Sequence, residues 1–96
     1  MIEITNQHIK NGKLDREALS EFGVDAVKFD GDNIIFNSNV DFWRCESLIF
    51  IENAIFNGDV WIAYCDSLMS IKRTVFKSKV SFYENKNLIL LKRIYS

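Results

Sequence analysis

From residue 35 onward, apolar residues recur in a 20-position pattern that is written three times without an insertion. Each unit reads apolar-Phe-x-x-x-Val-x-apolar-x-x-Cys/Asn-x-x-Leu-x-x-apolar. The Val-x-apolar pair alternates as in a short strand with both side chains on one face. Because strands that recur every 20 residues cannot be joined by hairpins, we expect them to be parallel neighbours. The pairs are Val40/Phe42, Val60/Ile62 and Val80/Phe82.

Equal spacing also predicts how the core is built. Residues 20 positions apart should lie one above another, so that each unit buries its apolar positions against the next. The predicted fold is mainly β, a parallel β-solenoid of short repeats with one continuous core. Its expected columns are Val40/Val60/Val80, Phe42/Ile62/Phe82 and Leu48/Leu68/Leu88.

Over residues 35–96 the unit resembles leucine-rich repeats, particularly the short bacterial kind. In that family an apolar-x-apolar strand is followed three positions on by Asn or Cys, here Cys45, Cys65 and Asn85. The resemblance implies a buried turn where a small side chain packs or hydrogen-bonds to neighbouring backbone. Two residues separate Cys from Leu where the common pattern has one, and the family's proline is absent. A three-faced parallel β-helix is the alternative architecture.

Residues 1–34 lack the repeat and are predicted to cap it, which makes residues 1–96 a single domain. Residues 2–5 alternate as a short strand, and residues 11–15 read as a turn that leads into a helix over about 15–22. Asp15 is a good N-cap and Gly23 a C-terminal stop. The helix is expected to cover the open core face of the first unit, and packing beside a sheet is the alternative.

Charge is polarised along the chain, although the formal net charge is only −1. Residues 1–71 hold 5 basic and 12 acidic residues, whereas residues 72–96 hold 7 basic and 1 acidic. A solvated face that blocks strand pairing is one explanation, and an acidic partner is the other. Nucleic acid is disfavoured as that partner because no RNA-binding aromatic signature is present. The basic end comprises Lys72, Arg73, Lys77, Lys79, Lys86, Lys92 and Arg93.

The outward positions of the predicted strands carry the candidate binding site. Four aromatic residues are expected on one sheet face, with one acidic and one basic residue beside them. Trp and Tyr often supply binding energy at interfaces, and four together exceed scattered surface apolars. The alternative is that the N-terminal segment folds over this face and buries it. The residues are Trp43, Trp61, Tyr64, Tyr83, Asp41 and Arg44.

No nucleophile elbow, phosphate loop, supported carboxylate pair or metal-ligand spacing is found in the sequence. With no cofactor or metal expected, we predict a non-enzymatic module that binds another protein and inhibits or sequesters it. Cys45 and Cys65 are expected to be free thiols packed as small hydrophobes rather than a disulfide or metal ligands. His8 is expected to be exposed and without a special role.

No signal peptide or membrane-spanning stretch is visible, so we expect a cytoplasmic protein without a membrane partner. The apolar residues 89–95 close the chain without a helical cap, which favours a homodimer through the C-terminal repeat. A structural, self-associating protein is therefore the alternative function. Abundant Asn, Ile, Lys and Phe fit an AT-rich genome, such as that of a phage or low-GC bacterium. A small phage inhibitor of a host or defence protein would suit the size.

Overall fold

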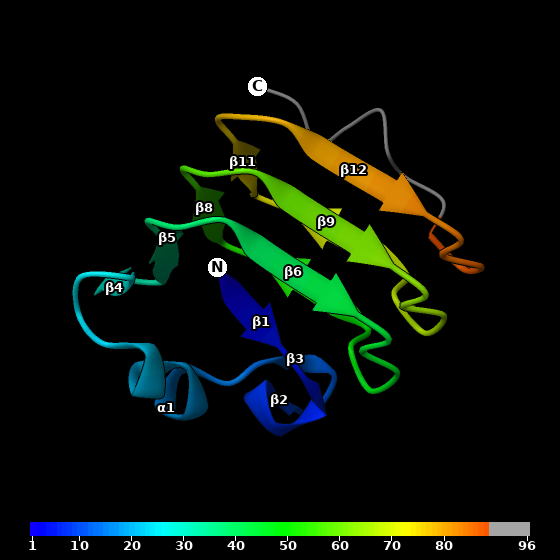
Figure 1. Cartoon of the computed structure of the whole chain (residues 1–96). Helices are drawn as coiled ribbons and strands as arrows, with labels where there is room; N and C mark the ends of the chain where they lie inside the picture. Colours follow the sequence, from blue (N-terminus) through cyan, green and yellow to red (C-terminus); the bar gives the residue numbers. More distant parts are fainter. Residues whose placement is uncertain (89–96) are drawn as a thin grey trace.

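The computed structural model describes residues 1–88 and is mainly β (Figure 1). Residues 89–96 lie outside this description, and with them Lys92, Arg93 and the expected apolar dimer edge. The N-terminal elements are β1 (Ile2–Ile4), η1 (Asn6–His8), β2 (Ile9–Lys10), β3 (Lys13–Leu14), α1 (Arg16–Leu19), η2 (Ser20–Phe22) and β4 (Val27–Asp30). The later strands are β5 (Asn33–Phe36), β6 (Val40–Trp43), β7 (Phe50–Glu52), β8 (Ala54–Phe56), β9 (Val60–Ala63), β10 (Ser70–Lys72), β11 (Val75–Phe76) and β12 (Val80–Tyr83).

The strands β1, β6, β9 and β12 form the sheet nearest the viewer in Figure 1, called here the front sheet. All of its pairings are parallel, and each repeat strand is displaced by 20 residues from the one beside it. Val60, for example, lies between Val40 and Val80. The prediction that residues 20 apart lie one above another is therefore confirmed for these strands.

Every repeat unit also supplies strands to two other ladders. One is the parallel pair of β7 and β10, and the other is a back sheet in the order β11-β8-β5-β4. The strands β5, β8 and β11 pair in parallel, whereas β4 joins β5 as an antiparallel hairpin over the predicted turn at residues 30–32. The fold is thus mainly β with parallel ladders, but its sheets are mixed at one edge.

Stacked side chains fill the space between the ladders. The rings of Phe36 and Phe56 lie 4.8 Å apart and nearly parallel, and Phe76 continues the stack at 5.2 Å from Phe56. Leu48 and Leu68 are fully buried in the same cluster, against which Leu88 packs. Each such side chain contributes about 1.5–3 kcal/mol on burial. The repeated register therefore produces a continuous core without any long-range sequence signal beyond the period itself.

The Cys/Asn position of each unit satisfies a backbone carbonyl of the strand beneath it. Cys45 Sγ donates to the carbonyl of Ile4 at 3.2 Å, and Asn85 Nδ2 donates to that of Ile62 at 2.8 Å. Cys65 occupies the equivalent place, 3.7 Å from the corresponding carbonyl. The neighbouring Cys65 thiol and burial raise the pKa of Cys45, which keeps it protonated and able to donate. Cys and Asn interchange here because both offer a small donor.

The predicted helix is present but shorter in its α-helical part. Asp15 caps it by accepting from the amide of Glu17 at 3.3 Å, as expected for an N-cap. The α-helical turn ends at Leu19, and a 3₁₀ turn continues to Phe22 before Gly23 adopts a positive φ of 88°. A single helix over 15–22 is therefore replaced by two short turns of different pitch.

The N-terminal segment caps the repeats with strands and a turn as well as with the helix. On the front sheet, β1 lies beside β6, and on the back sheet β4 lies beside β5. At the third ladder, the carbonyl of Gly12 accepts hydrogen bonds from the amides of Ile49 at 2.8 Å and Phe50 at 2.9 Å. Each ladder thus has a polar backbone partner at this end, while Leu19 enters the core. The segment lies at the end of the stack in Figure 1.

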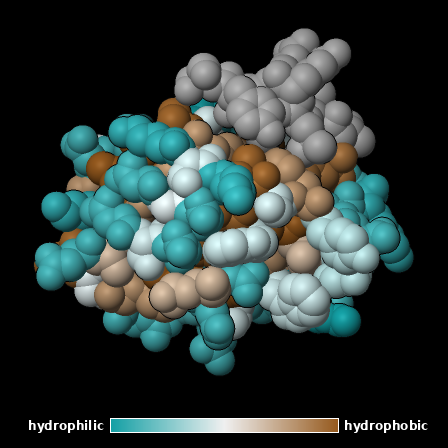
Figure 2. Space-filling view, turned by 45° about the horizontal axis from the view of Figure 1, so that its top comes forward, coloured by the Kyte–Doolittle hydropathy of each residue, from teal (hydrophilic) through white to brown (hydrophobic). Residues whose placement is uncertain are grey.

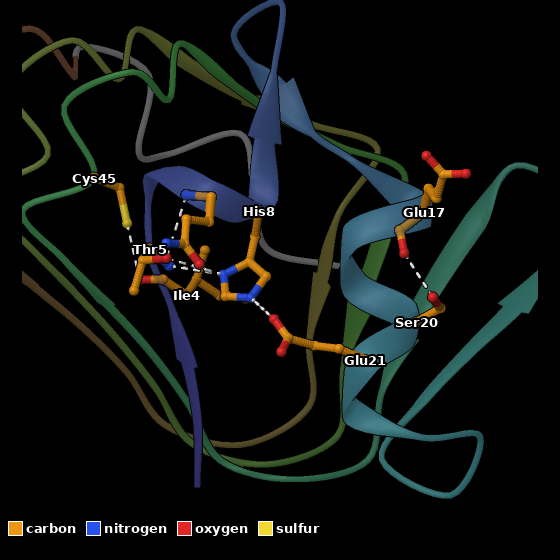
Figure 3. Close-up of polar contacts among 8 residues, drawn as sticks. Ile4, Thr5, His8, Glu17, Ser20, Glu21 and Cys45 are labelled. Atoms are coloured by element: carbon orange, nitrogen blue, oxygen red, sulfur yellow. Dashed lines mark hydrogen bonds and ion pairs between the residues drawn. The ribbon is translucent and has the colours of Figure 1, made fainter.

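The expectation that His8 is exposed is wrong. Its side chain is 4% exposed and packs against the Phe22 ring. Its Nδ1 accepts from the Thr5 amide at 3.0 Å, while Nε2 contacts the Glu21 carboxylate (Figure 3). His8 therefore ties the turn after β1 to the short helix, which buries it in spite of its polar surroundings in the sequence.

Replacement of Gly58 by Ala should destabilise the fold, because the new Cβ would lie 2.7 Å from both Asn39 Oδ1 and the Ser38 carbonyl. We expect Gly58→Ala to lower the free energy of unfolding by about 1–3 kcal/mol in urea denaturation. Ser38→Ala, at the equivalent position of the preceding unit, is the matched control and should change it by less than about 0.5 kcal/mol. Equal stability of Gly58→Ala and the natural protein would contradict the close packing of these corners.

Removal of the Cys45 thiol should loosen β1 from the first repeat. Cys45→Ala leaves the Ile4 carbonyl without its donor and opens a small void, so we expect a loss of about 1–3 kcal/mol in the free energy of unfolding. Cys45→Ser keeps a donor of similar size and should lose less. If chemical denaturation shows the Ser variant to be no more stable than the Ala variant, the hydrogen bond is not what this column requires.

Candidate interaction surface

The outward face of the front sheet presents two rows of side chains, one on each side of the inward Phe/Ile column. In the first row, Asp41 lies between Glu3 and Trp61, and Ser81 follows beyond Trp61. In the second row, Trp43 and Tyr83 lie on either side of Ala63. The strand alternation that buries the repeat positions thus places these residues on the opposite face.

Aromatic rings meet at the end of this sheet. Tyr64 lies between Trp43 and Tyr83, with ring centroids 5.0 and 5.6 Å away and nearly perpendicular planes. The Arg44 guanidinium lies over Trp43 at 5.5 Å and over Tyr64 at 5.2 Å. Trp43 is 52% exposed and Tyr83 59% exposed, so the N-terminal segment does not bury them. These four residues are called the aromatic surface below.

The aromatic surface depends on a corner that repeats in each unit. Arg44, Tyr64 and Glu84 follow their strands with φ between 54° and 55°, in the left-handed region. Each such residue costs about 1–2 kcal/mol relative to ordinary backbone. The corner turns the chain away from the strand and places the Tyr64 ring between its two neighbours. Desolvation and the Tyr83 hydroxyl raise the pKa of Tyr64, so the ring carries a neutral phenol.

The hydropathy of this side of the molecule is mixed rather than uniformly apolar. Figure 2 shows hydrophilic side chains close to apolar ones, with side chains of intermediate hydropathy gathered toward one side. Tyr and Trp combine a large apolar area with a polar tip, which suits a surface that is wet when free and dry when bound. The arrangement is typical of a protein-binding patch rather than of a misplaced core.

Trp61 stands apart from the aromatic surface. It is 37% exposed on the same face, but within residues 1–88 no ring contact joins it to the other three aromatic residues. Its direct strand partners are Asp41 and Ser81. The structure therefore brings Trp43, Tyr64 and Tyr83 together with Arg44, and places Trp61 and Asp41 next to them.

Glu3 is a member of this face that the sequence did not reveal. It pairs directly with Asp41 across β1 and β6, so two carboxylates face each other on the exposed side of the sheet. Burial and the neighbouring Glu3 charge raise the pKa of Asp41. Among residues 1–88, neither carboxylate belongs to an ion pair with a basic group. The one available sequence signal was the alternation of residues 2–5, which resembles the repeat strands.

The basic end is spread around the last unit rather than gathered on the front sheet. Lys72 and Arg73 lie at the end of β10, whereas Lys77 and Lys79 lie between β11 and β12. Arg73 pairs with Glu52 at 3.0 Å and with Asn53 at 2.8 Å, so part of this charge has a structural partner. Lys86 is exposed beyond β12. These residues do not converge on one described site.

Within residues 1–88, no group of three or more His, Cys, Asp or Glu side chains is placed to hold a metal ion. The two described thiols are free and buried. None of the helices in this part of the chain has the length and apolar character that crossing a membrane requires. The largest hollows are shallow, and the ones lined by charged residues lie along the N-terminal segment.

Comparison with models of protein families, with curated proteins and with solved structures found no match in any of the three.

The Glu3–Asp41 pair predicts an unusual dependence of stability on pH. Because the folded-state pKa of Asp41 is raised, its contribution is complete below the unfolded value near 3.8 and is lost as the pH rises through the folded value. Asp41→Asn removes this loss, and we expect its melting temperature at pH 7 to exceed that of the natural protein by about 2–5 °C.

The difference between the two proteins should shrink toward pH 3, which thermal melts across this range would show. Glu3→Gln relieves the same repulsion and serves as a matched variant with the same sign. A lower melting temperature of Asp41→Asn at pH 7 would mean that the Asp41 carboxylate stabilises the folded state.

Proposed function

We propose that the chain is a small non-enzymatic interaction module that binds a partner protein through the outward face of the front sheet. Binding through this face would inhibit or sequester the partner. The observation that carries the proposal is the contiguous set of Trp43, Tyr64 and Tyr83, exposed at the end of a sheet whose other face is fully buried. Rigid aromatic anchors of this kind supply most of the energy at protein interfaces.

The mechanism follows from the rigidity of the ladders. The backbone of each front strand is held on both sides by parallel neighbours, apart from the edge strands, so the outward side chains are arranged before a partner arrives. Little ordering is therefore needed on binding, and more of the contact energy becomes affinity. Tyr64 is further held between two rings and beneath the Arg44 guanidinium.

The three ladders support a solenoid of 20-residue coils as the finer architecture. Leucine-rich repeats carry one strand and a helix or 3₁₀ segment per unit. Here the second unit alone supplies β8, β9 and β10 to three different ladders. This favours the three-faced parallel β-helix, and the leucine-rich-like resemblance is then limited to the Val-x-apolar strand and its Cys/Asn turn.

Self-association is the second candidate function. The observation in its favour is the charge polarity of the chain, with basic residues such as Lys77 and Lys79 at one end of the stack and Glu3 and Asp41 toward the other. Copies could then join head to tail through opposite charges. Sedimentation at low and high salt tests this, because such oligomers should dissociate as salt screens the charges.

Affinity capture from a lysate of the source organism tests the binding function. Trp43→Ala combined with Tyr83→Ala should weaken partner capture by at least about 30-fold, since anchors of this type contribute 2 kcal/mol or more. The reason is loss of the two most exposed rings of the aromatic surface, and quantitative mass spectrometry of the captured protein measures it.

Met69→Ala is the matched control, because Met69 is 50% exposed but lies outside the front sheet. Its capture should equal that of the natural protein. Urea denaturation of all variants separates a binding defect from unfolding. Undiminished capture by the folded Trp43/Tyr83 variant would remove the aromatic surface as the binding site.

A further inference from the structure

The front sheet has a second feature beside its aromatic surface, a small hollow where β1 meets β6. It has a volume of about 170 Å³ and is lined by Glu3, Ile4, Thr5, Asp41 and Trp43. This is far larger than the about 10–15 Å³ needed for one water molecule. The hollow thus has two carboxylates, an indole and an apolar floor, and it is large enough for the end of a side chain.

We propose that this hollow receives an arginine side chain of the protein bound on the front sheet. The inference rests on the proposed binding function and adds the chemistry of the partner, which must present a basic residue beside an apolar segment. A guanidinium fits because its planar fork donates to carboxylates while its face stacks on an aromatic ring.

The charge of the hollow is unbalanced in the free protein. Glu3 and Asp41 are strand partners, and within residues 1–88 neither is joined to Lys, Arg or His. Like charges placed opposite each other destabilise a sheet. The raised pKa of Asp41 reports the same repulsion. A cation brought by the partner would relieve it, so charge complementarity selects a basic occupant over an acidic or neutral one.

Trp43 connects the hollow to the aromatic surface. Its ring already lies 5.5 Å from the Arg44 guanidinium, which shows that the indole is placed where a guanidinium can approach it. Yet Arg44 forms no ion pair with Glu3 or Asp41 among the described residues. A partner segment lying along the aromatic surface would therefore carry its arginine into the adjoining hollow without displacing Arg44.

The test is a titration of the ¹⁵N-labelled full chain with N-acetyl-arginine amide, followed by NMR. We expect saturable shifts at the Trp43 indole N–H and at the backbone amides of Glu3 and Asp41. N-acetyl-citrulline amide has nearly the same shape without the charge and should cause none of them. Asp41→Asn and Glu3→Gln should each weaken arginine binding by about tenfold, as expected for loss of a charged hydrogen bond.

Both variants are expected to be at least as stable as the natural protein, so weaker binding could not be ascribed to unfolding. Equal shifts with citrulline, or unchanged affinity of Asp41→Asn, would overturn the proposal. So would oligomers that arginine amide dissociates, because a second copy would then occupy the hollow. If the Trp43/Tyr83 variant fails to lose partner capture while the arginine titration succeeds, the proposed function fails and the hollow's preference stands.

Discussion

The structure depends on one constraint, the 20-residue register that places equivalent positions of successive units side by side. From it follow the stacked phenylalanine rings, the buried leucine column and the Cys/Asn donors that reach the carbonyl of the strand beneath. A slip of one residue would turn the inward Val-x-apolar pair outward and break all of these together. The ladders therefore cooperate, although no single contact in them is strong.

Periodicity was enough to predict the repeat strands, their parallel order and their columns, because each of these follows from equal spacing. It could not locate β1 in the front sheet. Ile2 lies opposite Val40, 38 residues away, so the pairing does not share the period. Glu3 was missed for the same reason. His8 was misplaced because its burial depends on Thr5 and on the distant Glu21, and no local pattern announces such a contact.

The candidate site was partly predictable for a related reason. Strand alternation identified which side chains point outward, so the grouping of Trp43, Tyr64 and Tyr83 could be anticipated from their positions. The direction of each side chain after the strand could not. The left-handed corner at residue 64 decides that Tyr64, rather than Trp61, lies between the other two rings. At Glu3 and Asp41 the demands of folding and of binding oppose each other, since a repulsion in the free sheet becomes an attraction for a cation.

The shared step of the three ladders has a consequence for how such a chain changes length. An added segment of 20 residues would lengthen the stack by one layer, about 4.8 Å, and leave every existing contact within the other layers intact. A shorter or longer segment would put the faces of later layers out of phase with those of earlier ones. Growth or loss of this chain is therefore tolerated in whole turns, and the outward face would widen by one strand with each of them.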